Sequence, residues 1–449
     1  MKLLMICIEF PPVNTTGNYR SAGFARYLKD NGVIPIIFTA EEKSAEKAFN
    51  KNSDHSLMKG LEDVKIFRFP IKPINEIYKG KIGNYFRIWL NYIDSIESRW
   101  FYGKNKIEIY KIIKEEKPDL LYVSLPPFSM AKAAIKISKD FKLPLIADMR
   151  DAWSLWGSSP FSTIFHFKLV KNLEAKLFKH SKFIIATSSE MASDFKNIHP
   201  NINSDKFKVV FNGYDDFNFA SINLQPFELK SDAFKIGYVG SFYYEPKIEE
   251  LMKIPWFKRK GLQKFYYSPR KEYWQYRSPY FFLKSLQKLI HSHPELSNKI
   301  IFEYIGKAPN WLYAMIEERG LIDNFIDHGF CNKNDVLRIQ SSWDAILATS
   351  EKIDGGLGYT IPSKSFDGIN LKKRIFAFVT PGAQNNFLRD YKQVVFFQPD
   401  EIEKNVEILR NEIINKNNAF EYTDLSENFN RNSQGNKLRL ILKDVEEKD

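Results

Sequence analysis

The residues best suited to chemistry lie in the stretch IPSKSFDGIN, residues 361–370. Pro362 at a helix start would leave the following backbone N–H groups without intrahelical partners, at the positive end of the helix dipole. Ser363 offers a hydroxyl group and Lys364 an ammonium group, so backbone, dipole and side chains could bind a phosphate together. One turn further on, the Asp367 carboxylate could accept hydrogen bonds from sugar hydroxyl groups. The spacing predicts a nucleoside diphosphate site, although Pro-Ser is also common helix-capping chemistry.

A second part of the same site is expected where an apolar run ends in GYVGS. Gly240 would let the backbone approach a phosphate closely, and Ser241 follows it. The stretch is not a complete Gly-x-Gly-x-x-Gly fingerprint. The chain also contains no Asp-x-Asp sequence, which indicates no metal-bound diphosphate. We therefore expect Lys364 and the helix start to neutralise a bound diphosphate, with no metal ion and no cofactor.

A third group of candidate residues lies in ADMRDAW, after another apolar run. Asp151 could orient or deprotonate an acceptor hydroxyl group. Arg150 could bind an acceptor phosphate, or it could pair internally with Asp151. Together with Lys364 these two are the predicted catalytic residues. The predicted acceptor side also includes Asn14, Gly17, Asp148 and Trp153.

Two series of short apolar runs, most of them followed by segments of helical periodicity, predict the elements that position these residues. Such strands joined by helices are typical of parallel sheets covered on both faces. The first series comprises residues 2–8, 33–38, 64–69, 119–124, 143–148, 182–188 and 207–211, and the second comprises 234–241, 299–306, 324–330, 344–350, 374–379 and 393–398. Pro35 predicts a short or marginal second strand, because proline donates no backbone hydrogen bond.

A chain of 449 residues is long enough for two cores. We expect an α/β protein with two Rossmann-like domains that face each other across a cleft. The first domain is predicted at 1–225 and the second, which contains the nucleoside diphosphate site, at 226–449, with a linker at 217–234. Ligands bind at the carboxyl ends of the strands in open sheets of this kind.

An insertion at about 244–282 interrupts the second series. Residues 251–282 contain eleven aromatic residues and eight Lys and Arg residues against one acid, Glu272. Aromatic rings among cations suit the headgroup layer of an anionic membrane. The same mixture could pack as a small aromatic core or stack on single-stranded nucleic acid, although no nucleic-acid partner is expected. The predicted membrane or lipid contacts are Trp256, Phe257, Lys258, Arg259, Lys260 and Trp274.

The overall charge fits an anionic neighbour, because 66 Lys and Arg residues against 54 Asp and Glu residues give a net charge of +12. Neither Cys7 nor Cys331 has metal-ligand spacing, which favours small core residues in a reduced cytoplasm. No apolar stretch reaches the length of a membrane span. Membrane contact is therefore expected to be peripheral, on the inner face of the cell membrane.

The chain resembles the GT-B glycosyltransferases of family 4, which are retaining nucleotide-sugar enzymes, over nearly its whole length. The similarity is greatest to a branch with Arg-Asp-x-Trp in the first domain and Pro-Ser-Lys in the second, found in bacterial surface polysaccharide assembly such as that of lipopolysaccharide and capsule. The stretches that carry it are EFPPVNTTGNYRSAGFARYL, PLIADMRDAWSLWG, VVFNGYDDF, IGYVGSFY and WDAILATSEKIDGGLGYTIPSKSFDGINLKKRIFAFVTPG.

The resemblance implies a role for each matching residue. Asp367 falls where the family has a Glu that binds the nucleotide ribose, and Ser363 and Lys364 fall in the phosphate-binding turn. Gly240 and Ser241 fall in the loop that faces the diphosphate. The resemblance also implies that residues 1–225 form the acceptor-side domain and residues 226–449 the domain that binds a nucleotide-sugar co-substrate. The chain departs from the family at Asp367 itself, which replaces the Glu, and at Tyr359, where a second Glu is frequent.

The sequence as a whole predicts a glycosyltransferase that moves a sugar from a nucleotide-sugar to a lipid-linked or glycan acceptor, with retention, in cell-surface polysaccharide biosynthesis. The alternative is a non-catalytic polyanion- or membrane-binding scaffold that kept the fold.

Overall fold

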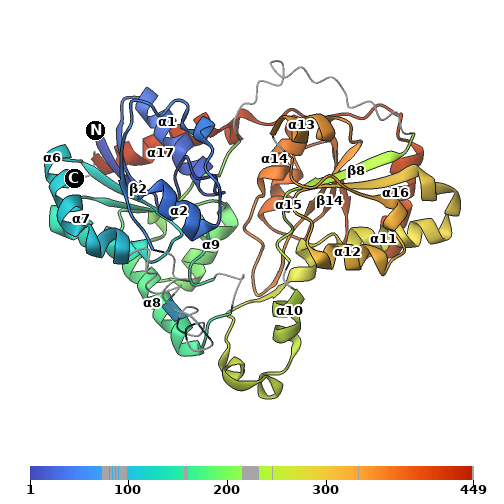
Figure 1. The fold of residues 1–449 in the computed structure, drawn as a ribbon, viewed down its shortest axis with the longest axis horizontal. Coiled ribbons are helices and arrows are strands. Elements are labelled where there is room, and N and C mark those ends of the chain that lie inside the picture. Colours follow the sequence, from blue (N-terminus) through green and yellow to red (C-terminus); the bar gives the residue numbers. More distant parts are fainter. Residues whose placement is uncertain are drawn as a thin grey trace. The chain divides into compact units, whose positions relative to one another are not determined.

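The computed structural model describes residues 1–72, 99–155, 160–214, 232–244, 246–331 and 333–446, with a few single positions between 80 and 90. Two compact units each contain a parallel sheet (Figure 1). Unit 1 comprises Met1–Gly213, Trp256–Pro269 and Glu427–Asp449, and unit 2 comprises Tyr214–Pro255 and Arg270–Ser426. The units differ from the predicted domains because two segments from the second half of the sequence pack with unit 1. Most of the predicted linker at 217–234 lies outside the described residues.

Unit 1 contains a seven-stranded parallel sheet with the strand order β3-β2-β1-β4-β5-β6-β7. Its five inner strands, β2, β1, β4, β5 and β6, are nearly continuous buried runs, as both faces of the sheet are covered there, whereas the edge strands β3 and β7 are only partly buried. Their bounds are β1 Lys2–Ile6, β2 Ile34–Ala40, β3 Lys65–Phe69, β4 Leu120–Leu125, β5 Leu145–Met149, β6 Phe183–Ala186 and β7 Phe207–Val209. All seven predicted strands of the first series are present.

The prediction of a short or marginal second strand was wrong. Strand β2 has seven residues and pairs with both β1 and β3. Neighbouring residues of a strand direct their N–H groups to opposite sides, and the N–H of Ile34 faces β1, where it donates to Met1. Pro35 therefore faces the β3 side, where pairing begins only at Ile36 with Lys65. No ladder hydrogen bond is lost.

Side chains of Thr and Ser cap two of the helices of unit 1 at their amino-terminal ends. The Thr163 side chain caps the helix at Ile164–His180, and the Ser188 side chain caps the helix at Ser189–Ile198. The helices are α1 Asn18–Asp30, α2 Glu42–Phe49, α6 Lys106–Glu116, α7 Met130–Phe141, α8 Ile164–His180, α9 Ser189–Ile198 and α17 Arg431–Glu446, with short turns η1 His55–Met58, η2 Arg99–Lys104 and η3 Ser204–Lys206.

Helix α17, at the carboxyl end of the described chain, packs on α1 of unit 1. Gly23 leaves room for Arg431, because a Cβ at residue 23 would lie 2.0 Å from the Arg431 Cδ atom. Gly435 makes the same kind of room for the Tyr27 ring. Leu442 of α17 is completely buried in the core of unit 1. These contacts explain why residues 427–449 belong with unit 1 although they follow the whole second sheet in sequence.

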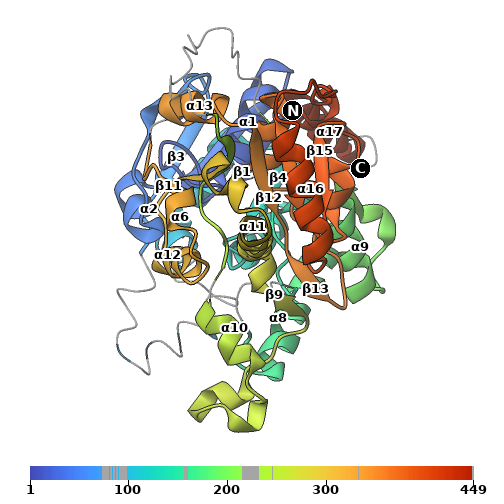
Figure 2. The ribbon, with the colours of Figure 1, turned by 90° about the vertical axis from the view of Figure 1, so that its right-hand side faces the viewer.

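Unit 2 contains a six-stranded parallel sheet with the order β11-β10-β8-β12-β14-β15, which Figure 2 views from another side. Numbered within the unit this is the Rossmann order 3-2-1-4-5-6. The strands are β8 Phe234–Val239, β10 Ile300–Ile305, β11 Phe325–Asp327, β12 Ala345–Thr349, β14 Arg374–Phe378 and β15 Val394–Phe397. The helices are α10 Pro246–Lys253, α11 Tyr280–Ser292, α12 Asn310–Glu317, α13 Lys333–Ser341, α14 Ser363–Asn370, α15 Ala383–Leu388 and α16 Ile402–Ile414, with turns η8 Pro294–Lys299 and η9 Ile322–Asn324. The turn η10 Glu427–Phe429 already belongs to unit 1.

The predicted insertion is divided between the two units. Its first half contains η5 Trp256–Lys258 and η6 Gly261–Phe265 and is held to unit 1 by paired backbone hydrogen bonds between Phe161 and Tyr267, at 2.8 and 2.9 Å. Its second half contains β9 Lys271–Tyr273 and η7 Trp274–Arg277. Strand β9 pairs antiparallel with β13 Lys352–Asp354 of unit 2.

No helix in the described ranges is long and apolar enough to cross a bilayer. Cys7 is buried, Cys331 is partly buried, and both are free thiols.

Candidate functional site

The carboxyl edge of the unit 2 sheet contains the point where the strand order reverses, between β8 and β12, and ligands of Rossmann-like domains bind at this point. Gly240 follows β8 directly and has a φ of +91°, which a side chain would strain. Its N–H donates to the carbonyl oxygen of Ile305 at 2.7 Å. The loop that contains Gly240 and Ser241 is thus fixed at the predicted edge of the sheet.

Helix α14 brings Lys364 to this loop. Pro362 is the N-cap residue with a φ of −64°, so the first helical residue is Ser363, one position later than predicted. The Lys364 Nζ atom donates hydrogen bonds to the Tyr238 hydroxyl at 2.5 Å and to the Ser241 carbonyl oxygen at 3.2 Å. It also lies 3.9 Å from the centroid of the Tyr238 ring, within the range of a cation–π contact. The fold therefore joins two sites that are more than 120 residues apart in sequence.

Burial lowers the pKa of Lys364 to about 7, and the negative charge of Asp367 opposes this shift only in part. The ammonium group is therefore close to its titration midpoint at neutral pH. An anion beside it would favour the charged form and raise the pKa again. Ser363 at the helix start is exposed, whereas Asp367 one turn further on is half-buried.

Glu351 contacts the loop before α14, although it lies further back in the sequence than the second Glu of the family, which would fall at Tyr359. Its Oε1 atom accepts a hydrogen bond from the backbone of Thr360 at 3.3 Å, and its Oε2 atom lies 3.6 Å from the Arg277 guanidinium. Arg277 also pairs with Glu272. Glu351 is only 4% exposed, so it holds this loop in place instead of presenting its carboxylate to a ligand.

The sequence interpretation missed two tyrosines at this edge. Tyr238 and Tyr304 are register partners in β8 and β10, with stacked rings 6.2 Å apart. The buried Tyr304 hydroxyl makes no hydrogen bond to any described residue. Both strands end in Tyr and an aliphatic residue and are followed by Gly, and this repetition could have identified the pair. Gly306, the second of these glycines, would place a Cβ 3.1 Å from the Gly240 carbonyl oxygen.

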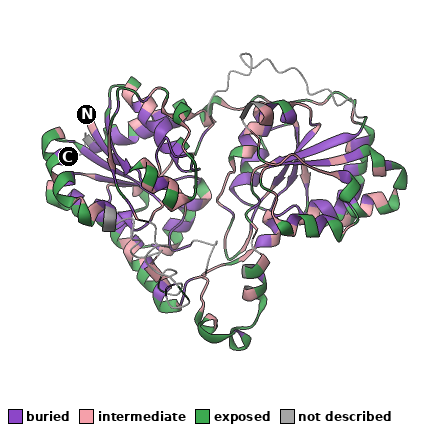
Figure 3. Ribbon diagram, viewed as in Figure 1, coloured by how far each residue is buried: buried purple, intermediate pink, exposed green. Residues whose placement is uncertain are grey.

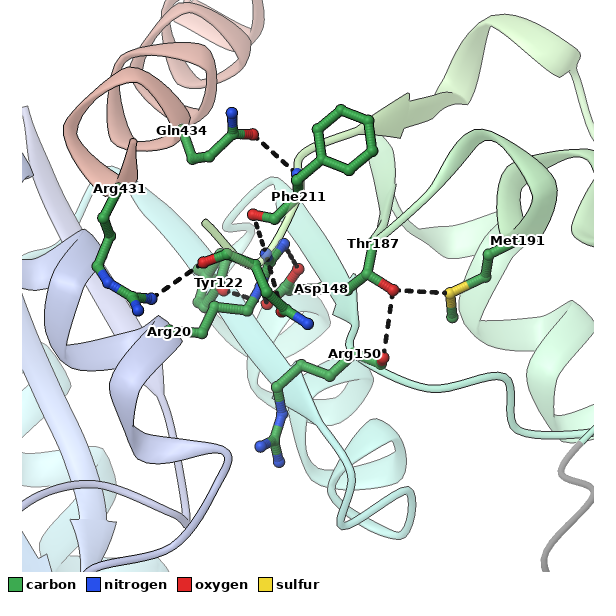
Figure 4. Close-up of polar contacts among 10 residues, drawn as sticks. Arg20, Tyr122, Asp148, Arg150, Thr187, Met191, Phe211, Arg431 and Gln434 are labelled. Carbon is green, nitrogen blue, oxygen red and sulfur yellow. Dashed lines mark hydrogen bonds and ion pairs between the residues drawn. The ribbon is translucent and has the colours of Figure 1, made fainter. Parts of the chain in front are cut away.

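In unit 1, Asp148 belongs to a buried cluster at the end of β5 (Figure 4). Arg20 donates to its two carboxylate oxygens at 2.7 and 2.9 Å, and the Tyr122 hydroxyl donates at 2.5 Å. Arg20 also donates to the carbonyl oxygen of Phe211 at 2.7 Å. The predicted acceptor contact of Asp148 is corrected, because its fully buried side chain is used inside the unit. The same holds for Trp153, which is fully buried and stacks on Phe128.

Arg150 points away from the Asp148 cluster in Figure 4. Its guanidinium forms an ion pair with Glu9 at 2.8 Å and donates to the carbonyl oxygen of Pro126. The charge of Glu9 raises the pKa of Arg150 against the effect of burial, and Asp151 adds to this. The main partner of Arg150 is thus Glu9, not Asp151 as the internal alternative supposed. Asp151 itself is half-buried.

The loop between β1 and α1 lies against Arg150. A Cβ at Gly17 would lie 1.4 Å from Nη1 of Arg150, so this glycine makes room for the guanidinium. The predicted role of Gly17, close approach by an acceptor, is therefore corrected. Asn14 is exposed, and its side-chain oxygen accepts a hydrogen bond from Tyr19 at 3.2 Å.

The predicted membrane contacts separate into two groups. Trp256, Phe257, Lys258 and Lys260 are exposed (Figure 3 colours this segment largely green). Arg259 is 8% exposed and Trp274 is 7% exposed, and these two are corrected to interior residues. In the described ranges, no group of three or more His, Cys, Asp or Glu side chains is placed to hold a metal ion.

Two Rossmann-like units, the second with glycines and a lysine gathered at the switch point of its sheet, define a protein of the GT-B fold class. Residues 22–216 match the model of Glycosyltransferase Family 4. This stretch makes up less than half of the chain, and it is similar to family 4 glycosyltransferases, as the sequence motifs predict. A search of curated protein sequences finds no match.

Solved structures show the same fold at low sequence identity. The chain aligns with a sucrose-phosphate synthase from Thermosynechococcus elongatus at a TM-score of 0.59 and 9% identity, over 100% of both chains. It aligns with the lipopolysaccharide outer core galactosyltransferase WaaB at a TM-score of 0.51 and 12% identity, over 97% of this chain and 98% of that one. WaaG, a glycosyltransferase involved in lipopolysaccharide biosynthesis, gives 0.51 and 13%, over 92% and 90%.

Proposed function

We propose that the protein transfers a sugar from a nucleoside diphosphate sugar to a lipid-linked or glycan acceptor, with retention at the sugar carbon, in cell-surface polysaccharide assembly. The observation that carries this proposal is the position of the Lys364 ammonium against the Gly240–Ser241 loop, at the start of α14. The finer points of acceptor and stereochemistry rest on the family resemblance. WaaB and WaaG, which have the same fold, are described as a lipopolysaccharide outer core galactosyltransferase and as a glycosyltransferase in lipopolysaccharide biosynthesis.

The donor diphosphate is proposed to bind where Lys364, the α14 amino end and the Gly240 backbone converge. Departure of the nucleoside diphosphate leaves negative charge on its terminal phosphate, and a lysine ammonium with free helix amides stabilises this charge without reorganisation. Asp367 lies one turn along α14 and is proposed to bind the ribose hydroxyl groups. No metal ion is required in this proposal.

Unit 1 is proposed to bind the acceptor substrate. Asp151 remains the candidate that orients the acceptor hydroxyl group, and the Arg150–Glu9 pair fixes the backbone on which Asp151 is carried. In a retaining transfer, a diphosphate oxygen of the donor can itself take the acceptor proton on the same face of the sugar. The main work of the protein is then to position the two substrates and to stabilise charge.

A thermal-shift and calorimetric screen of nucleoside diphosphates and their sugars tests the proposal, since a ligand that binds only the folded state raises its stability. We expect one nucleoside diphosphate to bind. Lys364→Met should weaken it by about 10- to 100-fold, the equivalent of a lost charge-assisted hydrogen bond. Asp367→Asn should weaken the nucleoside diphosphate more than inorganic pyrophosphate.

The matched control is Lys373→Met, because Lys373 is half-buried like Lys364 but donates to the carbonyl oxygen of Ser341 at 2.7 Å, at the end of α13. This change should leave nucleotide affinity intact. Absence of any nucleotide binding, combined with salt-sensitive binding of polyanions, would support the scaffold alternative.

A further inference from the structure

The segment 256–265 exposes apolar and basic side chains together. Trp256, Phe257, Leu262 and Phe265 are between 53% and 66% exposed, although large apolar side chains are normally buried. Exposed lysines alternate with them at Lys258, Lys260 and Lys264. The sequence from 251 to 271 contains no acidic residue. The segment therefore presents an apolar surface with a positive rim.

The segment has a defined conformation. The buried Arg259 donates to the carbonyl oxygen of Tyr266 at 3.4 Å, which links the first turn of the segment to its end. The Tyr267 ring then packs on Phe167 with 5.1 Å between centroids. These internal contacts hold the segment through Arg259, Tyr266 and Tyr267, while the exposed Trp256 and Phe257 rings pack edge to face on each other, 5.9 Å between centroids.

The amino-terminal half of α8 carries a second exposed apolar group in the same unit. Ile164, Phe165 and Leu169 are exposed, with Phe165 at 75%. Lys168 lies among them and Lys176 follows on the same side of the helix. The acid of this helix, Glu174, is fully buried and hydrogen-bonded to Ser154 and His199. The exposed side of α8 is thus also apolar and basic.

Backbone pairing brings these two elements together. Phe161 lies just before the start of α8 and exchanges its two backbone hydrogen bonds with Tyr267. Because Phe161 and Tyr267 are neighbours, the amino-terminal end of α8 and the 256–265 segment meet at this junction. Segments about a hundred residues apart in sequence therefore contribute exposed aromatic rings and lysines to one part of unit 1.

We propose that the 256–265 segment and the amino-terminal half of α8 form the surface by which the protein binds an anionic lipid bilayer. Trp and Phe rings enter the boundary between headgroups and acyl chains, where aromatic side chains are favoured, and the lysines meet lipid phosphates. The charge selects an anionic bilayer over a second copy of the chain, because two such positive surfaces would repel each other. This inference deepens the peripheral membrane association expected of the proposed function, but vesicle binding can be measured without sugar transfer.

The test is co-sedimentation of the full chain with vesicles of phosphatidylcholine alone and with added phosphatidylglycerol. We expect the wild type to pellet with the anionic vesicles. The double variant Trp256→Ser/Phe257→Ser, and separately Phe165→Ser/Leu169→Ser, should each reduce partitioning at least about tenfold, since each removes two apolar side chains from the bilayer. Lys258→Gln/Lys260→Gln should reduce binding to anionic vesicles only, and most at low salt.

Matched controls lie on α6 of the same unit. Ile107 is 88% exposed, so Ile107→Ser removes an equally open apolar side chain, and Lys111→Gln/Lys114→Gln removes two exposed lysines. Both controls should pellet like the wild type. Nucleotide thermal shifts measured on every variant show that unit 2 is intact, so a failure of membrane binding is distinguishable from a failure of the donor site.

Three results would overturn the proposal. The first is wild-type protein that stays in the supernatant with anionic vesicles, and the second is undiminished pelleting of both apolar double variants. The third is single-stranded oligonucleotide binding that is lost in the same variants while vesicle binding is not, which would assign the surface to nucleic acid.

Discussion

The Lys364 ammonium group lies 3.9 Å from the centroid of the Tyr238 ring and donates a hydrogen bond to the hydroxyl of the same residue. Tyr238 is part of the central strand β8, and Lys364 is in the first turn of α14. The contact places a titratable cation over an aromatic face at the edge of the sheet where a diphosphate is proposed to bind. The pKa of Lys364 is lowered by burial, because loss of water around the ammonium group disfavours its charged form.

The affinity for a nucleoside diphosphate should therefore depend on pH. The Lys364 pKa is about 7 in the free protein, so binding above this pH requires the uptake of a proton. We expect affinity to fall by up to about tenfold per pH unit above about pH 7. Calorimetry in buffers of different ionisation enthalpy measures the proton uptake. Lys364→Met should bind weakly with little dependence on pH in this range, and equal slopes in both proteins would contradict the assignment.

Without a ligand, the same group should make the folded state more stable as pH rises from about 7 to about 10. In this window the unfolded chain binds a proton that the folded protein does not, because the folded pKa is lowered. The comparison of urea midpoints for wild type and Lys364→Met isolates this contribution from other titrating groups. The urea midpoint of the wild type should rise relative to that of Lys364→Met as the pH increases through this window.

Gly240→Ala should damage the donor site through the backbone. Its φ of +91° strains any side chain, and the new Cβ would lie 3.2 Å from Cε of Lys364. We expect a loss of about 1–3 kcal/mol of stability together with weaker nucleotide binding. Gly261→Ala is the control, because Gly261 also has a positive φ, +53°, but a Cβ at this residue would have no heavy atom within 4 Å. Gly261→Ala should leave nucleotide affinity unchanged, and an equal effect of both changes would argue against a specific role of Gly240.

Asp148→Asn should destabilise unit 1 strongly. The change leaves the buried Arg20 without a carboxylate partner, and such losses cost about 3–5 kcal/mol. Denaturant unfolding measures the effect. Glu421→Gln removes an exposed pair with Lys392 and should change stability by less than about 1 kcal/mol. A near-neutral Asp148→Asn would show that this residue is not the buried anchor described above.

Leu442→Ala should show whether α17 is part of the core of unit 1. Leu442 is fully buried, and truncation of such a side chain costs about 2–5 kcal/mol. Leu440 on the same helix is 50% exposed, and its replacement by Ala should cost less than about 1 kcal/mol. Similar small effects at both positions would mean that the helix is only loosely attached in solution.

The sequence by itself determined the strands of both parallel sheets, because most of them are short, nearly continuous apolar runs that must be buried on both faces. It also determined the GT-B resemblance and the Pro-Ser-Lys helix start, because capping and turn chemistry act over a few residues. It could not show what Asp148 and Trp153 contact, since a polar residue at a strand end can face either the interior or a ligand. Only Arg20 and Tyr122, from other elements, assign Asp148 to the interior.

The tertiary structure alone decided which distant segments meet. The return of α17 to unit 1 depends on Gly23 and Gly435, whose missing side chains leave space that no local pattern predicts. The meeting of Lys364 with Tyr238 and the junction of Phe161 with Tyr267 are of the same kind. Local sequence specifies the conformation of each helix, strand and turn. Contacts between residues far apart in sequence depend on how the surfaces of whole helices and strands fit together when they pack.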